Sequence, residues 1–359
     1  HVFLIALKMI LRSAPCIMNS LVFGHSTSSV TSISILYFRS KPMTLSKIGL
    51  PFAAALLIAP LSAAAQQSIS PTIDGILSVS YGQSDLGGGA DLDREAFILK
   101  STISLNNSFS IGVDADHFRS SIDDFGVDID LSLNRFQIEP TYHFGNDFYV
   151  GGFIQRASVS FIDFDASGLF AGFEGGKWSA EAYAGKSDMT LGIFIETART
   201  LASSLHGVSV SYSASENLEI SAHVSQNNLP DNGLFGGGRH ELKSVAAFYK
   251  IGGGFSIHGA LDKFDSEAIS EETETSAIGV GYNFAEAGIN VPGTFMLEAD
   301  QTDYGFADVD TITASWVVPF GKQTAKPLDS IARNSSGDIR TPYIGYLSRN
   351  LILGFDPLD

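Results

Sequence analysis

Apolar and polar residues alternate one by one along most of the sequence from residue 66 to residue 320. From Phe136 to Phe144 every second residue is Phe, Ile, Pro or Tyr, and Gln, Glu, Thr and His stand between them. Successive side chains of a strand point to opposite faces, so this pattern gives each strand one apolar face and one polar face. The alternation therefore predicts an all-β fold.

Two kinds of connection separate the alternating segments. Some are very short and contain Gly or Asn, as at 106–107, 145–146 and 252–253, because these residues tolerate the positive φ of tight hairpin turns. Short turns at one end and long loops at the other are typical of transmembrane β-barrels. The connections that we expect to be long, polar and acidic are 84–93, 119–130, 159–166, 187–205, 227–240 and 265–273.

The number of strands follows from the alternating segments, of which we count fourteen. The segment 147–158 lacks clean alternation, and 126–133 is out of phase with 135–144, so twelve or sixteen strands remain alternatives. A large soluble β-sandwich or solenoid could also carry these patterns with its acidic faces in water. We favour an antiparallel up-and-down transmembrane β-barrel over 66–320. Its strands are expected near 73–83, 94–105, 108–118, 131–144, 147–158, 167–174, 177–186, 206–213, 217–226, 241–250, 254–264, 274–284, 293–303 and 309–320.

The segment 43–65 has the composition of a secretory signal peptide. Lys47 supplies a positive charge, residues 48–61 are apolar, and the alanines at 63–65 satisfy the small-residue rule for cleavage after Ala65. A transmembrane anchor is the less favoured interpretation, because the apolar span is short for a membrane helix. The segment therefore predicts export.

The two remaining segments flank this predicted exported chain. We expect 1–42 to be an upstream extension that the mature protein lacks, and 321–359 to be a periplasmic tail. Cys16 is the one cysteine in the sequence, so the mature chain would contain none, which suits passage through an oxidising compartment.

The last expected strand ends in alternating large apolar residues, Trp316, Val318 and Phe320. Together with the turn and loop pattern, this stretch resembles bacterial outer-membrane porins and related transmembrane β-barrels over roughly 66–320. The resemblance implies that these three residues form the strand read by the outer-membrane insertion machinery. It also implies a location in the bacterial outer membrane, in contact with lipid and lipopolysaccharide.

Acidic residues dominate the expected barrel. Residues 66–320 contain 12 Lys and Arg against 35 Asp and Glu, a net charge of −23, which disfavours nucleic-acid binding. A barrel of fourteen strands is wide enough for an aqueous lumen, and an acidic excess in a lumen favours cations. Alternation predicts that the pore-lining charges are Lys100, Asp114, Asp116, Arg135, Glu139, Glu181, Glu219, Lys250, Asp262, Glu298 and Asp300.

The function predicted from these features is passive passage of ions and small hydrophilic solutes, with a mild preference for cations. A non-conducting barrel with a structural or surface-binding role is the alternative. The apolar residues of 187–205 could fold inward as a constriction, or pack against neighbouring loops or another subunit. The oligomeric state is open.

Catalytic and metal sites are weakly supported. Glu219, His223 and Ser225 share one strand face, as a lipid hydrolase would require, but serine is common here and we favour coincidence. Acidic pairs such as Asp163 with Asp165 could bind Ca²⁺, yet none has the spacing of a dedicated calcium loop. We therefore expect no enzyme and no cofactor. The other acidic sets with this potential are Asp91 and Asp93; Asp123, Asp124, Asp128 and Asp130; and Glu271, Glu272 and Glu274.

Overall fold

The computed structural model describes residues 71–321, with the exception of 86–90, 125–126, 146, 160–161, 192–198, 230–237, 268–270 and 306–307. The expected extension, signal peptide and tail lie outside these ranges, apart from Gly321, and stay predictions. Among the residues described, no helix is long and apolar enough to cross a membrane.

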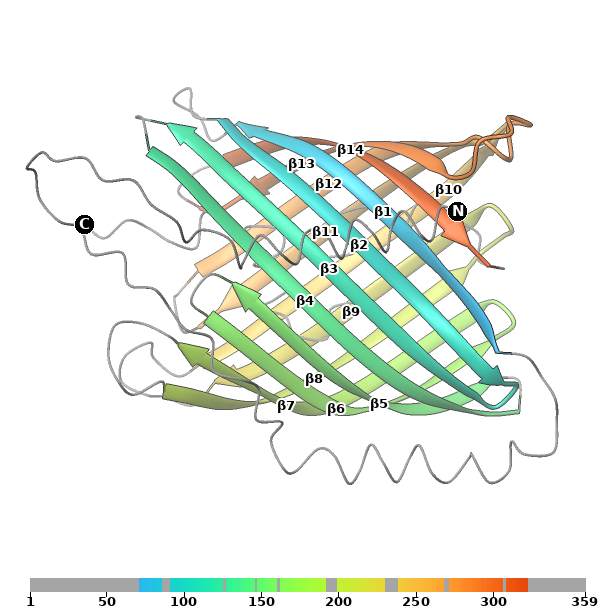
Figure 1. Ribbon diagram of the computed structural model, residues 1–359, viewed down its shortest axis with the longest axis horizontal. Helices are drawn as coiled ribbons and strands as arrows, with labels where there is room; N and C mark the ends of the chain where they lie inside the picture. The colour runs from blue at the N-terminus through green and yellow to red at the C-terminus, as the bar shows by residue number, and fades with distance from the viewer. Residues whose placement is uncertain are drawn as a thin grey trace, which may run out of the picture. The chain divides into compact units, whose positions relative to one another are not determined.

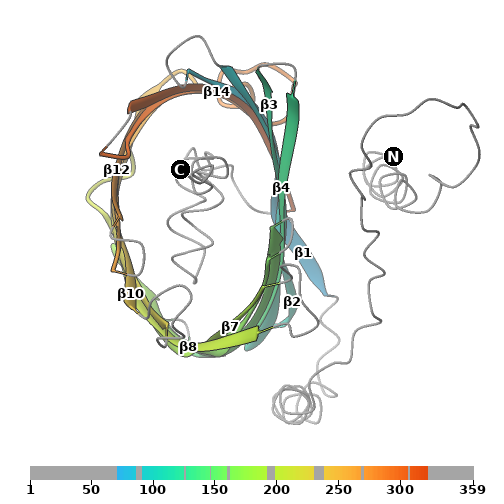
Figure 2. The same cartoon turned by 90° about the vertical axis from the view of Figure 1, so that its left-hand side faces the viewer.

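Fourteen antiparallel strands close into one barrel, in which each strand pairs with its neighbours in sequence and β1 pairs with β14 (Figures 1 and 2). The predicted all-β up-and-down barrel is confirmed, and the alternatives of twelve and sixteen strands are excluded. The strands are β1 Thr72–Asp85, β2 Asp91–Asn106, β3 Phe109–Asp124, β4 Val127–Phe144, β5 Phe148–Val159, β6 Ile162–Gly175, β7 Trp178–Leu191, β8 Arg199–Ser213, β9 Leu218–Leu229, β10 Gly238–Gly252, β11 Phe255–Ser266, β12 Glu271–Asn283, β13 Thr294–Asp303 and β14 Asp308–Phe320.

The expected long loops are mostly strand. In the predicted loop 119–130, pairing between β3 and β4 continues without a register shift until Asp124 meets Val127. In the predicted loop 187–205, β7 and β8 remain paired until Leu191 meets Arg199. The prediction of these loops was wrong because strand pairing continues beyond the segments with an apolar face, and strands that leave the membrane can carry polar and charged residues.

The barrel is polar inside and apolar outside near its short turns. On β14, Thr311, Thr313 and Ser315 are buried, whereas Ile312 is 62% exposed and Trp316 is 38% exposed. Buried polar and exposed apolar side chains are the reverse of the arrangement in a soluble protein, and they match a wall between lipid and a polar interior. We call the part of the barrel nearer the short turns the turn-end half.

The polarity of both faces reverses further along the strands, in what we call the loop-end half. β11 shows the change: Ile257 and Leu261 are exposed near the turn, and the next outward residues are Lys263 and Asp265, while the inward residue between them is the buried Phe264. Other strands follow the same course. On β6, Asp163 and Asp165 face outward and Phe164 is buried. The loop-end half therefore has the polarity of a structure surrounded by water.

The apolar belt of the outer surface is bounded by aromatic residues. It runs from Phe255 to Leu261 on β11 and from Ile73 to Tyr81 on β1, so it covers roughly seven to nine residues of a strand. This corresponds to about 20 Å for a rise of about 3.4 Å and a tilt of about 40°. Aromatic residues such as Trp178 and Phe255 are exposed at the turn end, where the ring centroids of Trp178 and Tyr212 lie 4.4 Å apart and those of Phe255 and Tyr282 lie 4.6 Å apart. Tyr81 marks the opposite edge of the belt, where its hydroxyl donates a hydrogen bond to Asp93.

Candidate functional site

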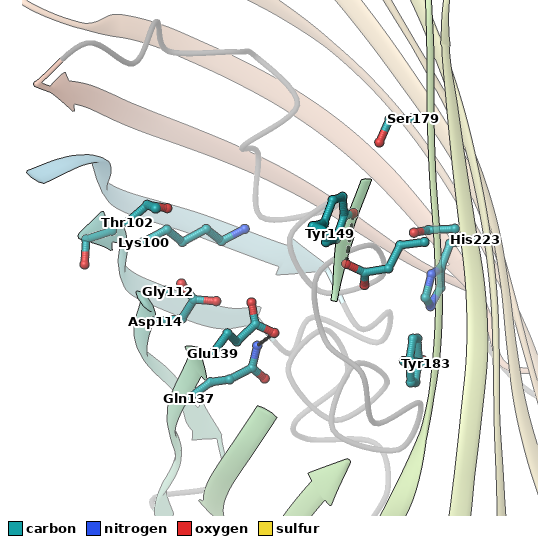
Figure 3. Close-up of a pocket in the computed structure, with 13 residues that line it drawn as sticks. Lys100, Thr102, Gly112, Asp114, Gln137, Glu139, Tyr149, Ser179, Tyr183 and His223 are labelled. Carbon is teal, nitrogen blue, oxygen red and sulfur yellow. Dashed lines mark hydrogen bonds between the residues drawn. The ribbon is translucent and has the colours of Figure 1, made fainter. Parts of the chain in front are cut away.

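A cavity of about 330 Å³ opens on the inner wall of the barrel. Lys100, Asp114 and Glu139 come from the adjacent strands β2, β3 and β4, and they lie across from Tyr149 and His223 of β5 and β9 (Figure 3). Side chains from seven strands converge on this cavity, so the face that carries them is the lumen face. The full lining is Lys100, Ser101, Thr102, Gly112, Asp114, Gln137, Glu139, Tyr149, Ser179, Glu181, Tyr183, Ser209 and His223.

The predicted pore-lining residues lie on the strand positions that face the lumen, alternating with the exposed residues of the belt. Four of them, Lys100, Asp114, Glu139 and Glu181, line the cavity. The remaining seven occupy other parts of the lumen wall and do not line this cavity; they are Asp116, Arg135, Glu219, Lys250, Asp262, Glu298 and Asp300.

Arg135 and Asp116 form a buried ion pair rather than two separate charges on the wall. Arg135 Nε donates to Asp116 Oδ2 at 2.6 Å, and both side chains are almost fully buried. The pair continues into a polar chain, because the Arg135 guanidinium also reaches Gln137 Oε1 at 3.4 Å and Gln137 Nε2 donates to Glu139 Oε1 at 2.9 Å. The positive charge of Arg135 is thus held against Asp116, which leaves Glu139 as the end of the chain that faces the cavity.

A second polar contact joins two strands that are not neighbours. His258 of β11 lies 2.8 Å from Glu298 Oε2 of β13, across the intervening strand β12. Gly279 makes this possible, because a Cβ at that position would come within 2.3 Å of the His258 ring. Sequence reasoning placed Glu298 in the lumen but missed its partner; a glycine at an inward position between two polar residues is the signal that could have found it.

On the opposite side of the barrel, glycines likewise leave room for aromatic rings to lie flat against the wall. The Tyr149 ring covers Gly172 and its hydroxyl donates to Glu181 Oε2 at 3.2 Å. Tyr183 covers Gly207 and stacks on His223, with ring centroids 6.3 Å apart. Aromatic side chains thereby fill the space that the glycines leave, a known way of stabilising glycine-containing strands.

The hydrolase arrangement is not formed. Glu219, His223 and Ser225 lie on the same face of β9, but the buried Ser225 Oγ makes no hydrogen bond within the described part of the chain. A nucleophilic serine requires a base within hydrogen-bond reach, so this set lacks the contact that would activate it.

Several of the acidic residues considered for Ca²⁺ lie on the outer surface, where some are paired with basic residues; those whose side chains the structure describes are Asp93, Asp163, Asp165, Glu272 and Glu274. Arg156 lies 3.6 Å from Asp163 and 3.8 Å from Asp165, and Lys263 lies between Glu272 and Glu274. Within the described ranges, no group of three or more His, Cys, Asp or Glu is arranged to hold a metal ion.

The predicted insertion signal forms the seam of the barrel. Trp316 pairs with Val79, Val318 with Leu77, and Phe320 with Gly75. The Phe320 ring lies over Gly75, where a Cβ would approach it to 2.4 Å. The three residues share the outward face of β14, so they are placed on the surface that a membrane-embedded partner would meet.

Comparison with known proteins adds a likeness of fold. The sequence matches no protein-family model and no curated protein. Among solved structures, an anion-selective porin from Comamonas acidovorans is similar with a TM-score of 0.46 and 12% identity, over 70% of this chain and 99% of that one. A loop-deletion mutant of OmpT, an outer membrane protein of Vibrio cholerae, gives 0.47 and 12%, over 70% and 100%. The monoaromatic hydrocarbon channel CymD gives 0.45 and 11%, over 76% and 93%.

The resemblance to porin-like outer-membrane barrels is confirmed at the level of the fold, by the closed barrel of fourteen antiparallel strands.

Proposed function

We propose that this protein is a passive channel across the bacterial outer membrane for ions and small hydrophilic solutes. The observation that carries the proposal is the inverted polarity of the turn-end half, where exposed apolar side chains surround a wall of polar and charged ones. A closed barrel leaves no unpaired strand edge toward lipid, and its polar lumen offers solutes a path through the apolar layer.

Conductance across a planar lipid bilayer tests this function. Refolded protein is expected to produce discrete current steps in KCl, because a lumen lined by polar groups can hold water and ions. Protein that is folded and inserted but gives no current and no uptake of any solute would contradict the channel proposal. A barrel refolded without insertion into the bilayer serves as the blank.

The proposed charge preference rests on the excess of acidic over basic residues on the lumen wall. Asp116 neutralises Arg135, and Lys250 lies 3.3 Å from Glu286 at the turn end. Eight of the eleven predicted pore-lining residues are acidic and three are basic, so the lumen wall carries a negative excess. Fixed negative charge favours cation entry, and salt screens it over about 10 Å at 0.1 M.

We expect a mild cation preference that strengthens as the salt concentration falls. Reversal potentials in a KCl gradient measure it. Replacement of Glu139, Glu181, Glu298 and Asp300 by their amides should bring the reversal potential close to zero, whereas the same change at Glu272 and Glu274 on the outer surface should alter it little. An anion-selective wild-type channel, or a preference that survives the four replacements, would show that other charges control selectivity.

The proposed partners follow from the two surfaces. Lipid would contact the belt, and the charged exterior of the loop-end half lies where lipopolysaccharide headgroups would surround the protein. The outward face of β14 would meet the assembly machinery during insertion.

A non-conducting barrel is the second candidate, and one observation favours it. Apolar side chains of the loop-end half, including Leu133 and Phe264, are almost completely buried inside the barrel. If this apolar interior stayed closed, no solute would pass, and the barrel would have a structural or surface-binding role.

A further inference from the structure

Ten buried apolar side chains form one cluster inside the loop-end half of the barrel. They are inward-facing residues that lie about eight to eleven positions from the short turns of their strands. No member is more than 9% exposed. The cluster consists of Ala96, Ile98, Phe118, Leu133, Ala157, Val159, Phe164, Met189, Leu242 and Phe264, and the partly buried Leu131 packs against it.

The cluster reaches both walls of the lumen. Leu133 belongs to β4 and Phe264 to β11, and these strands are seven steps apart in either direction around a barrel of fourteen. Apolar side chains of the cluster therefore line opposite walls of the lumen at this level. A solute that moves along the lumen therefore meets the cluster.

The cluster is not explained by lipid, because the outer surface at the same level is charged. Arg156 and Asp163 form an ion pair there with both side chains more than 40% exposed. Lys263 and Asp265 flank Phe264 on β11 and face away from the lumen. The charged exterior of the loop-end half suits water or polar headgroups, and the apolar groups gather on the inside, where a general porin would keep polar side chains.

The charged part of the lumen lies next to the cluster, on its turn-end side. Asp116 is two residues from Phe118 on β3, Arg135 is two residues from Leu133 on β4, and Asp262 is two residues from Phe264 on β11. The lumen thus presents two zones in series, one apolar and one charged. Apolar constrictions hinder ions and water because both must give up hydration to enter them.

We infer that the apolar cluster is the specificity-determining barrier of the channel, and that it favours solutes which carry an uncharged apolar part beside a polar end. This inference rests on the proposed channel function. An aromatic ring or a short alkyl group can make apolar contacts with the cluster residues as the solute passes between them. A hydrated group of equal size cannot make these contacts. The charged zone selects ions by the sign of their charge, and the apolar cluster limits the ion flux.

Uptake by proteoliposomes of leucine and asparagine tests the inference. The two amino acids have the same number of non-hydrogen atoms and the same zwitterionic end, and the lipid bilayer resists both. The wild-type protein is expected to admit leucine about tenfold faster, a factor in the range that small apolar differences produce in protein sites. Phe264→Ser and Leu133→Ser, on opposite walls, should lower this ratio toward one and raise the KCl conductance.

Two further variants keep the result interpretable. Leu261→Ser lies on the same strand as Phe264 but on the lipid face, so it should leave the ratio unchanged. Met189→Thr alters the least buried member of the cluster, and it should shift the ratio in the same direction if the larger changes prevent folding. Circular dichroism and the heat-dependent shift in gel mobility report whether each barrel is folded.

The outcomes separate the two proposals. Equal uptake of both amino acids by the wild type, or an unchanged ratio in folded cluster variants, would overturn the barrier. A wild type that is silent to every solute but is opened by Phe264→Ser would identify the cluster as a seal, and this also overturns the inference. Silence of the wild type and of all cluster variants would instead refute the channel function itself.

Discussion

Replacement of Arg135 by methionine is expected to lower the free energy of unfolding by about 3–5 kcal/mol. The guanidinium and the Asp116 carboxylate are both almost fully buried, and Asp116 Oδ2 accepts its bond from Arg135 Nε. Methionine fills a similar volume but leaves the carboxylate without its counter-charge in a poorly hydrated place. Reversible denaturant titration of the protein folded into lipid vesicles measures the change.

Two variants show whether the loss comes from the unpaired charge. Arg156→Met breaks exposed contacts with Asp163 and Asp165, so it should cost less than about 1 kcal/mol. Combining Arg135→Met with Asp116→Leu removes both charges and should restore most of the stability, because the penalty arises from the charge left behind. A loss for Arg135→Met no larger than that for Arg156→Met would mean that water reaches Asp116.

Replacement of Val280 by arginine is expected to lower the free energy of unfolding in vesicles by about 2–4 kcal/mol, the cost of a basic residue near the bilayer midplane on a barrel exterior. Val280 is 50% exposed on the outer surface of β12, and its cross-strand partners Ile257 and Leu297 are exposed apolar residues too. The same titration measures the effect.

Gln83→Arg is the matched control, because Gln83 is an exposed outward residue of β1 in the loop-end half. Water or headgroups would surround an arginine there, so little change is expected. Equal costs at the two positions would place the boundary of the membrane elsewhere along the strands, and would remove the distinction between the two halves.

The strand order and the facing of the charged residues could be predicted from the sequence because both depend on local patterns. The period-two alternation assigns each side chain to a face, and the Gly and Asn turns fix which strands pair. Glu139 and Asp300, for example, could be assigned to the lumen face from the alternation of apolar and polar residues in their own strands alone.

The strand lengths and the contacts on the lumen wall could not be predicted, because they depend on register and on reversed polarity. The segment 126–133 looked out of phase with 135–144, yet β4 runs through both without a bulge. Leu131 and Leu133 face inward, whereas Phe136 faces outward, so the apparent phase shift is the place where the polarity reverses. The pairing of Asp116 with Arg135 required knowing that these residues lie directly opposite each other on β3 and β4.

The pairing of β1 with β14 has a consequence for how the chain folds. The seam joins Gly75 to Phe320, so β1 can pair with its second neighbour, β14, only after the whole of the intervening chain is available. Closing a loop of this length is entropically costly, and contacts between residues so distant in sequence form slowly. Until then β1 and the newest strand both expose unpaired edges, which are templates for aggregation. A chain truncated before β14 would lack the means to close, however well its first thirteen strands pair.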